Sequence, residues 1–145
     1  MPDNLSPAER KRTMARVRSR DTTPELVVRR LLHERGYRFR LQRTDLPGAP
    51  DIVLPAYGAI VLVHGCFWHQ HRCRRGGRPL PVSNREYWER KLARNVQRDR
   101  RVRRQLRRLG WRVLVVWECQ TAPSKRAALA ERLERFLTNR SRMPE

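Results

Sequence analysis

Residues 65–73, near the middle of the chain, combine two thiols, two imidazoles and two adjacent large aromatic rings. Thiolates and neutral imidazoles are the usual protein ligands of zinc, whereas exposed aromatic rings beside positive charge suit stacking on nucleic-acid bases. The segment therefore predicts a metal site and a base-stacking surface that coincide on one loop.

Three zinc ligands, Cys66, His71 and Cys73, lie in this segment, and the only other cysteine, Cys119, follows the last predicted strand. A fourth ligand from a distant segment would tie the loop to the sheet. Because four protein ligands leave no open coordination position, such a zinc would be structural rather than catalytic. His69 could replace His71 as the ligand, and buried cysteines beside a surface histidine are the alternative interpretation.

Carboxyl and imidazole side chains suited to phosphodiester hydrolysis are spread over several segments: Glu25, Asp51, His64, His69 and Asp99. Asp51 follows a proline-rich turn and should project from the sheet end near the carboxyl end of the next strand, where it could hold Mg²⁺. An imidazole oriented by a carboxylate can act as general base. The alternatives are a turn role for Asp51, pairing with arginine for Asp99, and interaction with the helix macrodipole for Glu25.

Adjacent Phe67 and Trp68, with Trp88, are candidates for insertion between DNA bases. Unstacking costs a few kcal/mol and costs least at a mispaired step, so such a wedge would favour mismatched or damaged DNA. Core packing is the alternative for these rings.

Apolar periodicity and turn residues predict the elements that position these side chains. Helices are expected at 6–17, 23–36, 83–110 and 127–137, and strands at 37–41, 51–54, 59–63 and 111–117. The third helix begins at a capping-box pattern and carries an apolar stripe that includes Leu92, Leu106 and Leu109, with Asp99 on the same stripe. This order predicts an α/β fold in which a β-meander is followed by a helical crossover to a further strand.

The composition favours an intracellular protein that binds a polyanion. The 145 residues suit a single domain, and 34 Lys+Arg against 14 Asp+Glu leave a net charge of +20. An arginine-rich proteome is the alternative cause. Three cysteines argue against a closed disulfide framework, and the apolar runs are too short for a signal peptide or a membrane span. We expect a basic DNA-binding arm at 1–22, for which a frayed terminus is the alternative, a catalytic domain at 23–139 and a disordered tail at 140–145.

Several ordered motifs resemble the very short patch repair (Vsr) DNA mismatch endonucleases, and the resemblance extends from about Lys11 to the last helix. The motifs are Leu46-Pro47-Gly48-Ala49-Pro50-Asp51, His64-Gly65-Cys66-Phe67-Trp68-His69, Asn95-Val96-Gln97-Arg98-Asp99, Leu109-Gly110-Trp111-Arg112-Val113-Leu114 and Trp117-Glu118-Cys119. The resemblance implies a restriction-endonuclease-like fold, with a central mixed sheet flanked by helices and a structural zinc site. It also implies Mg²⁺-dependent nicking 5′ to the thymine of a T:G mismatch, such as deamination of 5-methylcytosine leaves.

The resemblance also implies a role for each candidate residue. Asp51 and the main-chain carbonyl of Val63 would hold Mg²⁺, His69 would activate water, and Asp99 would accept a hydrogen bond from His69. Glu25 and His64 match supporting positions in the active site. Phe67, Trp68 and Trp88 match intercalating rings, Met14 matches the arm that closes over the opposite groove, and the zinc ligands match Cys66, His71, Cys73 and Cys119. The loop at 74–85 departs from the family pattern, which leaves the preferred flanking sequence open.

The expected partner is double-stranded DNA with a T:G mismatch. We expect a monomer, because no long unused apolar surface is evident, and a cytoplasmic protein that is not bound to a membrane. The expected setting is the bacterial nucleoid, with a functional link to a cytosine-5 DNA methyltransferase. Two other functions fit the residues: a non-catalytic nucleic-acid-binding module stapled by zinc, and a restriction-type nuclease that cuts both strands of intact DNA.

Overall fold

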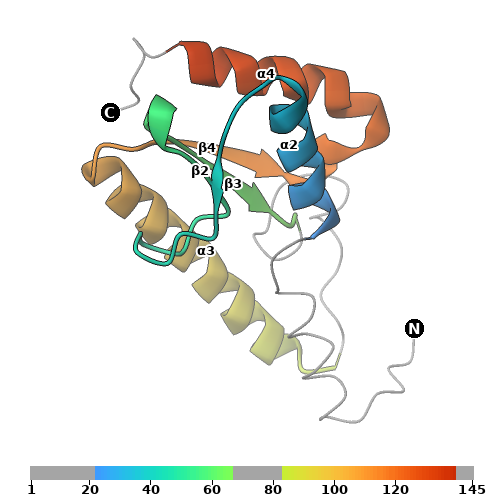
Figure 1. Cartoon of the computed structure of the whole chain (residues 1–145). Coiled ribbons are helices and arrows are strands. Elements are labelled where there is room, and N and C mark those ends of the chain that lie inside the picture. The colour runs from blue at the N-terminus through green and yellow to red at the C-terminus, as the bar shows by residue number, and fades with distance from the viewer. Residues whose placement is uncertain (1–21, 67–82, 140–145) are drawn as a thin grey trace.

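A computed structural model describes residues 22–66 and 83–139 of the chain (Figure 1). The helices are α2 (Thr23–Glu34), α3 (Arg85–Arg108) and α4 (Arg126–Thr138), and the strands are β1 (Arg40–Leu41), β2 (Ile52–Leu54), β3 (Ala59–His64) and β4 (Arg112–Trp117). Short 3₁₀ turns lie at Pro55–Tyr57, Glu118–Thr121 and Pro123–Lys125. The order of these elements is the predicted one. The predicted helix at 6–17, the tail at 140–145 and residues 67–82 lie outside the described residues.

The strands form one mixed sheet in the order β1-β2-β3-β4. The pairs β1–β2 and β2–β3 are antiparallel, and β3–β4 is parallel with α3 in the intervening sequence. This arrangement confirms the predicted meander followed by a crossover. The pairing brings the start of β2 beside the end of β3, and His64 at the end of β3 opposite Trp117 at the end of β4.

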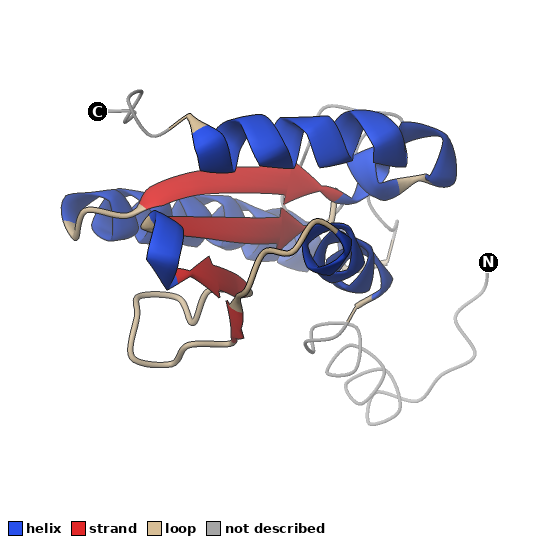
Figure 2. Cartoon of the chain, turned by 45° about the horizontal axis from the view of Figure 1, so that its top comes forward, coloured by secondary structure: helices blue, strands red, loops and turns tan. Residues whose placement is uncertain are grey.

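Helices cover both faces of the sheet. Alternate residues of β3 point to opposite faces, and each set packs against different helices. Ala59 and Val61 belong to a core that also contains buried residues of α2 and α4, whereas Ile60 and Leu62 belong to a second core with Leu106 of α3. Figure 1 shows α4 and α3 on opposite sides of the strands, and in Figure 2 α4 runs along β4. The protein is thus a mixed α/β sandwich around a four-stranded sheet. Among the described residues, no helix combines the length and apolar character that a membrane span requires.

Arg112 joins α4 to the sheet through a buried guanidinium. The side chain is 3% exposed and donates hydrogen bonds to the main-chain oxygens of Phe136, Leu137 (3.5 Å) and Tyr57 (2.9 Å). Phe136 and Leu137 lie in the last turn of α4, where carbonyl groups lack helical partners and the helix dipole favours a cation. This buried charge is therefore balanced by the helix terminus.

Three local predictions were wrong. The first strand covers only Arg40–Leu41, because Tyr37 instead continues the turn after α2, donating its backbone N–H to Leu32 O at 3.0 Å. The capping box at the start of α3 is not formed: Asn84 caps the helix with a φ of 58° and without a side-chain hydrogen bond. The apolar stripe of α3 ends at buried Leu106, and Leu109 is 61% exposed.

The turn before β2 packs closely against α3, and this contact positions Asp51. Ala49 N–H donates to Leu46 O at 3.1 Å, and Gly48 has a φ of +73°. A Cβ on Gly48 would lie only 2.6 Å from Cγ1 of Val102. Glycine is therefore required here both by the left-handed backbone and by the close approach of the helix.

We expect Gly48→Ala to lower the free energy of unfolding by about 2–4 kcal/mol, combining left-handed strain with overpacking against Val102. Urea denaturation measures this loss. Gly58→Ala is the matched control, because Gly58 also has a positive φ of +58° but has nothing within 4 Å of its added Cβ. The control should lose only about 1–2 kcal/mol. Equal losses in the two variants would show that overpacking against Val102 does not add to the destabilisation of Gly48→Ala.

Candidate active site at the sheet edge

Asp51 lies where the sequence predicts it, at the start of β2 and beside the carboxyl end of β3. It immediately precedes β2, and its Oδ2 accepts a hydrogen bond from the backbone N–H of Val63 at 3.0 Å. Antiparallel pairing of the two strands explains this contact, because the beginning of one strand lies beside the end of the other. The carboxyl group and the Val63 main chain thus share one edge of the sheet.

Glu25 brings a second carboxyl group to Asp51 from a distant segment. It lies in the first turn of α2, is 2% exposed and is hydrogen-bonded to the Asp51 side chain. Its Oε2 pairs with Arg29, and its Oε1 accepts from Gln42 Nε2 at 3.3 Å. Interaction with the helix macrodipole alone, the alternative considered from the sequence, requires neither this burial nor these contacts.

The electrostatics of this acid pair favour a cation. Burial raises the pKa of Asp51, and this rise is opposed by the Val63 N–H, by His64, by the hydrogen bond to Glu25 and by Arg29. Two carboxyl groups in contact either share a proton or bind a positive ion. Carboxylate oxygens and a main-chain carbonyl are suitable ligands for a hard divalent cation. Within the described residues, no three His, Cys, Asp or Glu side chains converge on one point, so such a site would rely on the acid pair and the main chain.

His64 and Asp99 form an imidazole–carboxylate pair next to these acids. His64 lies on the same face of β3 as Ile60 and Leu62, which pack toward α3, and its Nε2 lies 2.9 Å from Asp99 Oδ1 of that helix. Both side chains are nearly buried, at 7% and 9% exposure. Asp99 Oδ2 also faces Arg103 Nη2 at 3.4 Å. Asp99 therefore contacts both a histidine and an arginine, the two partners that the sequence left open. His69, for which a bond to Asp99 was expected, lies outside the described residues.

Two of the expected zinc ligands meet beyond the ends of β3 and β4. Cys66 is fully buried, and its Sγ accepts a hydrogen bond from Cys119 N–H at 3.4 Å. Neither thiol is in a disulfide. The parallel register of the two strands brings these positions level, although 53 residues separate them. The other expected ligands, His71 and Cys73, lie outside the described residues. The described thiols suit a soft metal such as zinc, but they do not by themselves complete a site.

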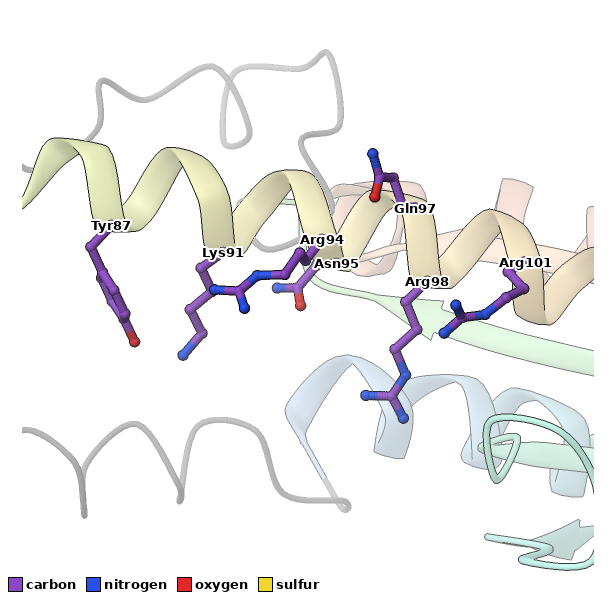
Figure 3. Close-up of a pocket in the computed structure, with 7 residues that line it drawn as sticks. All are labelled: Tyr87, Lys91, Arg94, Asn95, Gln97, Arg98 and Arg101. Atoms are coloured by element: carbon purple, nitrogen blue, oxygen red, sulfur yellow. The ribbon is translucent and has the colours of Figure 1, made fainter.

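Side chains of α3 line a basic groove of about 490 Å³. Figure 3 shows its lining side chains projecting from successive turns of the helix: Tyr87, Lys91, Arg94, Asn95, Gln97, Arg98 and Arg101. At the N-terminal end of the groove, the rings of Tyr87 and Trp88 meet edge to face at 5.6 Å, and Lys91 Nζ lies within 6 Å of both rings (5.8 and 5.9 Å). Positive charge beside accessible aromatic rings suits a nucleic-acid strand. The other expected intercalating residues, Phe67, Trp68 and Met14, lie outside the described residues.

Sequence reasoning did not identify several residues that complete these clusters. Arg29 follows Glu25 by four residues on a helix, and Arg103 follows Asp99 by four, so helical spacing could have predicted both pairs. The 45% exposed Tyr87 follows no apolar pattern, and nothing near Gln42 in the sequence indicates its contact with Glu25.

The sheet edge carries an acid pair and an imidazole–carboxylate pair, and it lies beside a helix face rich in arginine. These features define a hydrolytic enzyme that acts on a polyanion. Comparison with known proteins agrees with this class. Residues 2–75 match the family model described as DNA mismatch endonuclease Vsr.

Curated relatives match nearly the whole chain. The type II nicking enzyme V.XorIIP of Xanthomonas oryzae is 51% identical over 94% of this chain and 98% of its own length. The DNA mismatch endonuclease Vsr of Escherichia coli is 41% identical over 94% of this chain and 88% of its own. The type II nicking enzyme V.NmeAIP of Neisseria meningitidis is 37% identical over 94% and 95%.

The chain belongs to the Vsr family of DNA mismatch endonucleases. It is a DNA-cleaving hydrolase, so DNA is its substrate, and the non-catalytic binding module considered from the sequence does not apply. The four-stranded sheet flanked by helices is consistent with a Vsr nuclease fold.

Proposed function

We propose that this enzyme nicks one DNA strand 5′ to the thymine of a T:G mismatch, with Mg²⁺ as the catalytic metal, and thereby starts very short patch repair of deaminated 5-methylcytosine. The observation that carries the proposal is the contact of the buried Glu25 carboxyl group with the half-buried Asp51 at the end of β3. Further support comes from the names of the relatives, which include a mismatch endonuclease and nicking enzymes.

In the proposed site, Asp51 and the main-chain carbonyl of Val63 would hold Mg²⁺, and Glu25 would support them. A bound Mg²⁺ would neutralise charge on the scissile phosphate and lower the pKa of its water. His69 takes the proton from the attacking water, as the resemblance implies. His64, whose imidazole is oriented by Asp99, is suited to assist proton transfer near the scissile phosphate.

The proposed DNA interface extends along α3. Trp88 would enter the base stack together with Phe67 and Trp68, while Met14 and the basic arm at 1–22 contact the opposite groove. Cys66, His71, Cys73 and Cys119 would hold a structural zinc that keeps this aromatic loop rigid; the contact between Cys119 and Cys66 supports the pairing of two of them. The same proposal includes a restriction-endonuclease-like fold, a disordered tail at 140–145 and a monomeric state. It also includes action at the bacterial nucleoid in the cytoplasm and a functional link to a cytosine-5 DNA methyltransferase.

Nicking of matched duplexes tests the proposal. Purified protein is incubated with Mg²⁺ and end-labelled DNA that contains either a T:G mismatch or a T:A pair in otherwise identical sequence. We expect a single break 5′ to the mismatched thymine, no break in the opposite strand, and no cleavage with EDTA. Cleavage of both strands of the T:A duplex would instead support the restriction-type nuclease. A panel of flanking sequences then defines the preferred context.

The basic groove predicts how affinity depends on salt. Arg98 and Arg101 line the groove and are exposed, so each can contact a phosphate. Each lost phosphate contact reduces the slope of log K against log salt by about 0.9, so the double variant Arg98→Ala/Arg101→Ala should reduce it by about 1.8. Fluorescence anisotropy over a salt series, without metal, measures the slope. Arg135→Ala on α4, on the opposite side of the sheet, is the control, and an equal change in the control would remove the groove from the interface.

A further inference from the structure

Gln42 adopts a backbone conformation that few glutamines adopt. It directly follows β1 and has a φ of 50°, in the left-handed region that glycine and asparagine enter most easily. The pairing of Leu41 with Ile52 brings Gln42 level with Asp51. Strained non-glycine residues persist where the surrounding structure holds them, and they are frequent at functional sites.

Both the main chain and the side chain of Gln42 contact the acid pair. Its backbone N–H donates to the main-chain oxygen of Asp51 at 3.3 Å, and its Nε2 donates to Glu25 Oε1, also at 3.3 Å. Arg29 occupies the other oxygen of Glu25. One residue therefore connects the strand that carries Asp51 to the carboxyl group that Asp51 contacts, across 17 positions of sequence.

The chemical type and length of the side chain matter for this contact. A carboxamide donates a hydrogen bond but carries no charge, so it orients Glu25 without adding to the positive charge that Arg29 already brings to this carboxyl group. Asparagine or glycine would adopt the same backbone with less strain, but neither reaches Glu25 from this position in the same way. Backbone geometry alone thus does not explain a glutamine here.

We propose that Gln42 is a positioning residue for the divalent cation: its carboxamide holds the Glu25 carboxyl group against Asp51, so that the acid pair is organised before the metal arrives. The inference rests on the proposed function, because it assumes that these acids bind a metal. Groups that orient metal ligands typically contribute about 10- to 100-fold to metal affinity or activity.

The test uses the full-length protein with Gln42→Asn and Gln42→Gly, which tolerate the left-handed backbone but lose the reach to Glu25. Mg²⁺ and Mn²⁺ binding without DNA is measured by calorimetry, and the Mg²⁺ concentration for half-maximal nicking is measured separately. We expect both variants to bind the metals about 10-fold or more weakly. Their metal-free melting temperature should be unchanged or higher, and DNA affinity without metal should be unchanged. Gln105→Asn, on the exposed side of α3, is the control for the same chemical change and should behave as wild type.

Two results would overturn the inference: metal affinity equal to wild type in both Gln42 variants, or a lower metal-free melting temperature with a matching loss of DNA affinity, which indicates a purely structural role. Failure of the proposed function is distinguishable, because it shows in the wild-type protein as nicking without a divalent cation. If wild-type nicking requires the metal and the Gln42 variants bind the metal as tightly as wild type, the inference fails and the proposed function stands.

Discussion

Asp51→Asn should abolish nicking and, at the same time, make the metal-free protein more stable. The catalytic loss should be about 1,000-fold or more, since a bound metal contributes several kcal/mol of transition-state stabilisation. The gain in stability has a separate cause. Burial raises the pKa of Asp51 despite its hydrogen bond from Val63, so the folded protein opposes ionisation of this group.

The sign of the pH dependence follows from this shift. An acid whose pKa is higher in the folded state does not oppose folding at a pH well below its ordinary value of 3.8. As the pH rises from that value through the folded pKa, the carboxylate forms in a poorly solvated site and folding free energy is lost. Asparagine cannot ionise, so the advantage of the variant should be absent in acid and fully present at neutral pH.

Thermal unfolding with EDTA over a pH series measures this difference. Asp45→Asn is the control, because Asp45 is an exposed acid whose pKa is lowered, chiefly by its hydrogen bond with Arg43. The Asp45→Asn control should show the opposite and smaller effect. It should be less stable than wild type at neutral pH, and this difference should shrink in acid. If Asp51→Asn melts below wild type at neutral pH, ionisation of Asp51 does not destabilise the folded protein. If the variant still nicks DNA, the acid pair is not the catalytic metal site. Saturating Mg²⁺ should reverse the order by stabilising wild type and not the variant.

Asp99→Asn should reduce single-turnover nicking by about 100- to 10,000-fold while leaving DNA affinity nearly unchanged. The carboxylate accepts from His64 on one oxygen and faces Arg103 with the other, so it serves two donors at once. An amide has one oxygen and one donor group, and either His64 or Arg103 would then face an N–H. His64 would then lose the carboxylate oxygen that orients its imidazole.

The experiment must separate this effect from a loss of stability, because Asp99 is nearly buried and its replacement leaves a cation less well compensated. Nicking is therefore measured well below the melting transition of both proteins, with Glu86→Gln, an exposed acid of the same helix, as the control. A variant that melts earlier but nicks at the wild-type rate at low temperature would show that the pair is purely structural.

The order of the elements could be predicted because it depends on patterns within short segments. The continuous apolar run of β3 indicates burial on both faces, and the spacing of Val28 and Leu32 indicates a helix that covers the sheet. The failures occurred where contacts override local preference. Tyr37 extends the helix-ending turn and packs edge to face against Tyr57 at 5.3 Å, so the strand starts later than its alternation suggests.

The sequence by itself determined the family, the basic character and the types of residue available for chemistry, because these depend on identity and spacing along the chain. Only the tertiary structure decided which groups meet: Asp99 with His64, Glu25 with Asp51 and Gln42, and Cys66 with Cys119. Such pairs join segments that lie far apart in sequence, and their contact depends on strand register and on the way helices pack across the sheet. Periodicity predicts the face on which a side chain lies, but only packing decides what it faces.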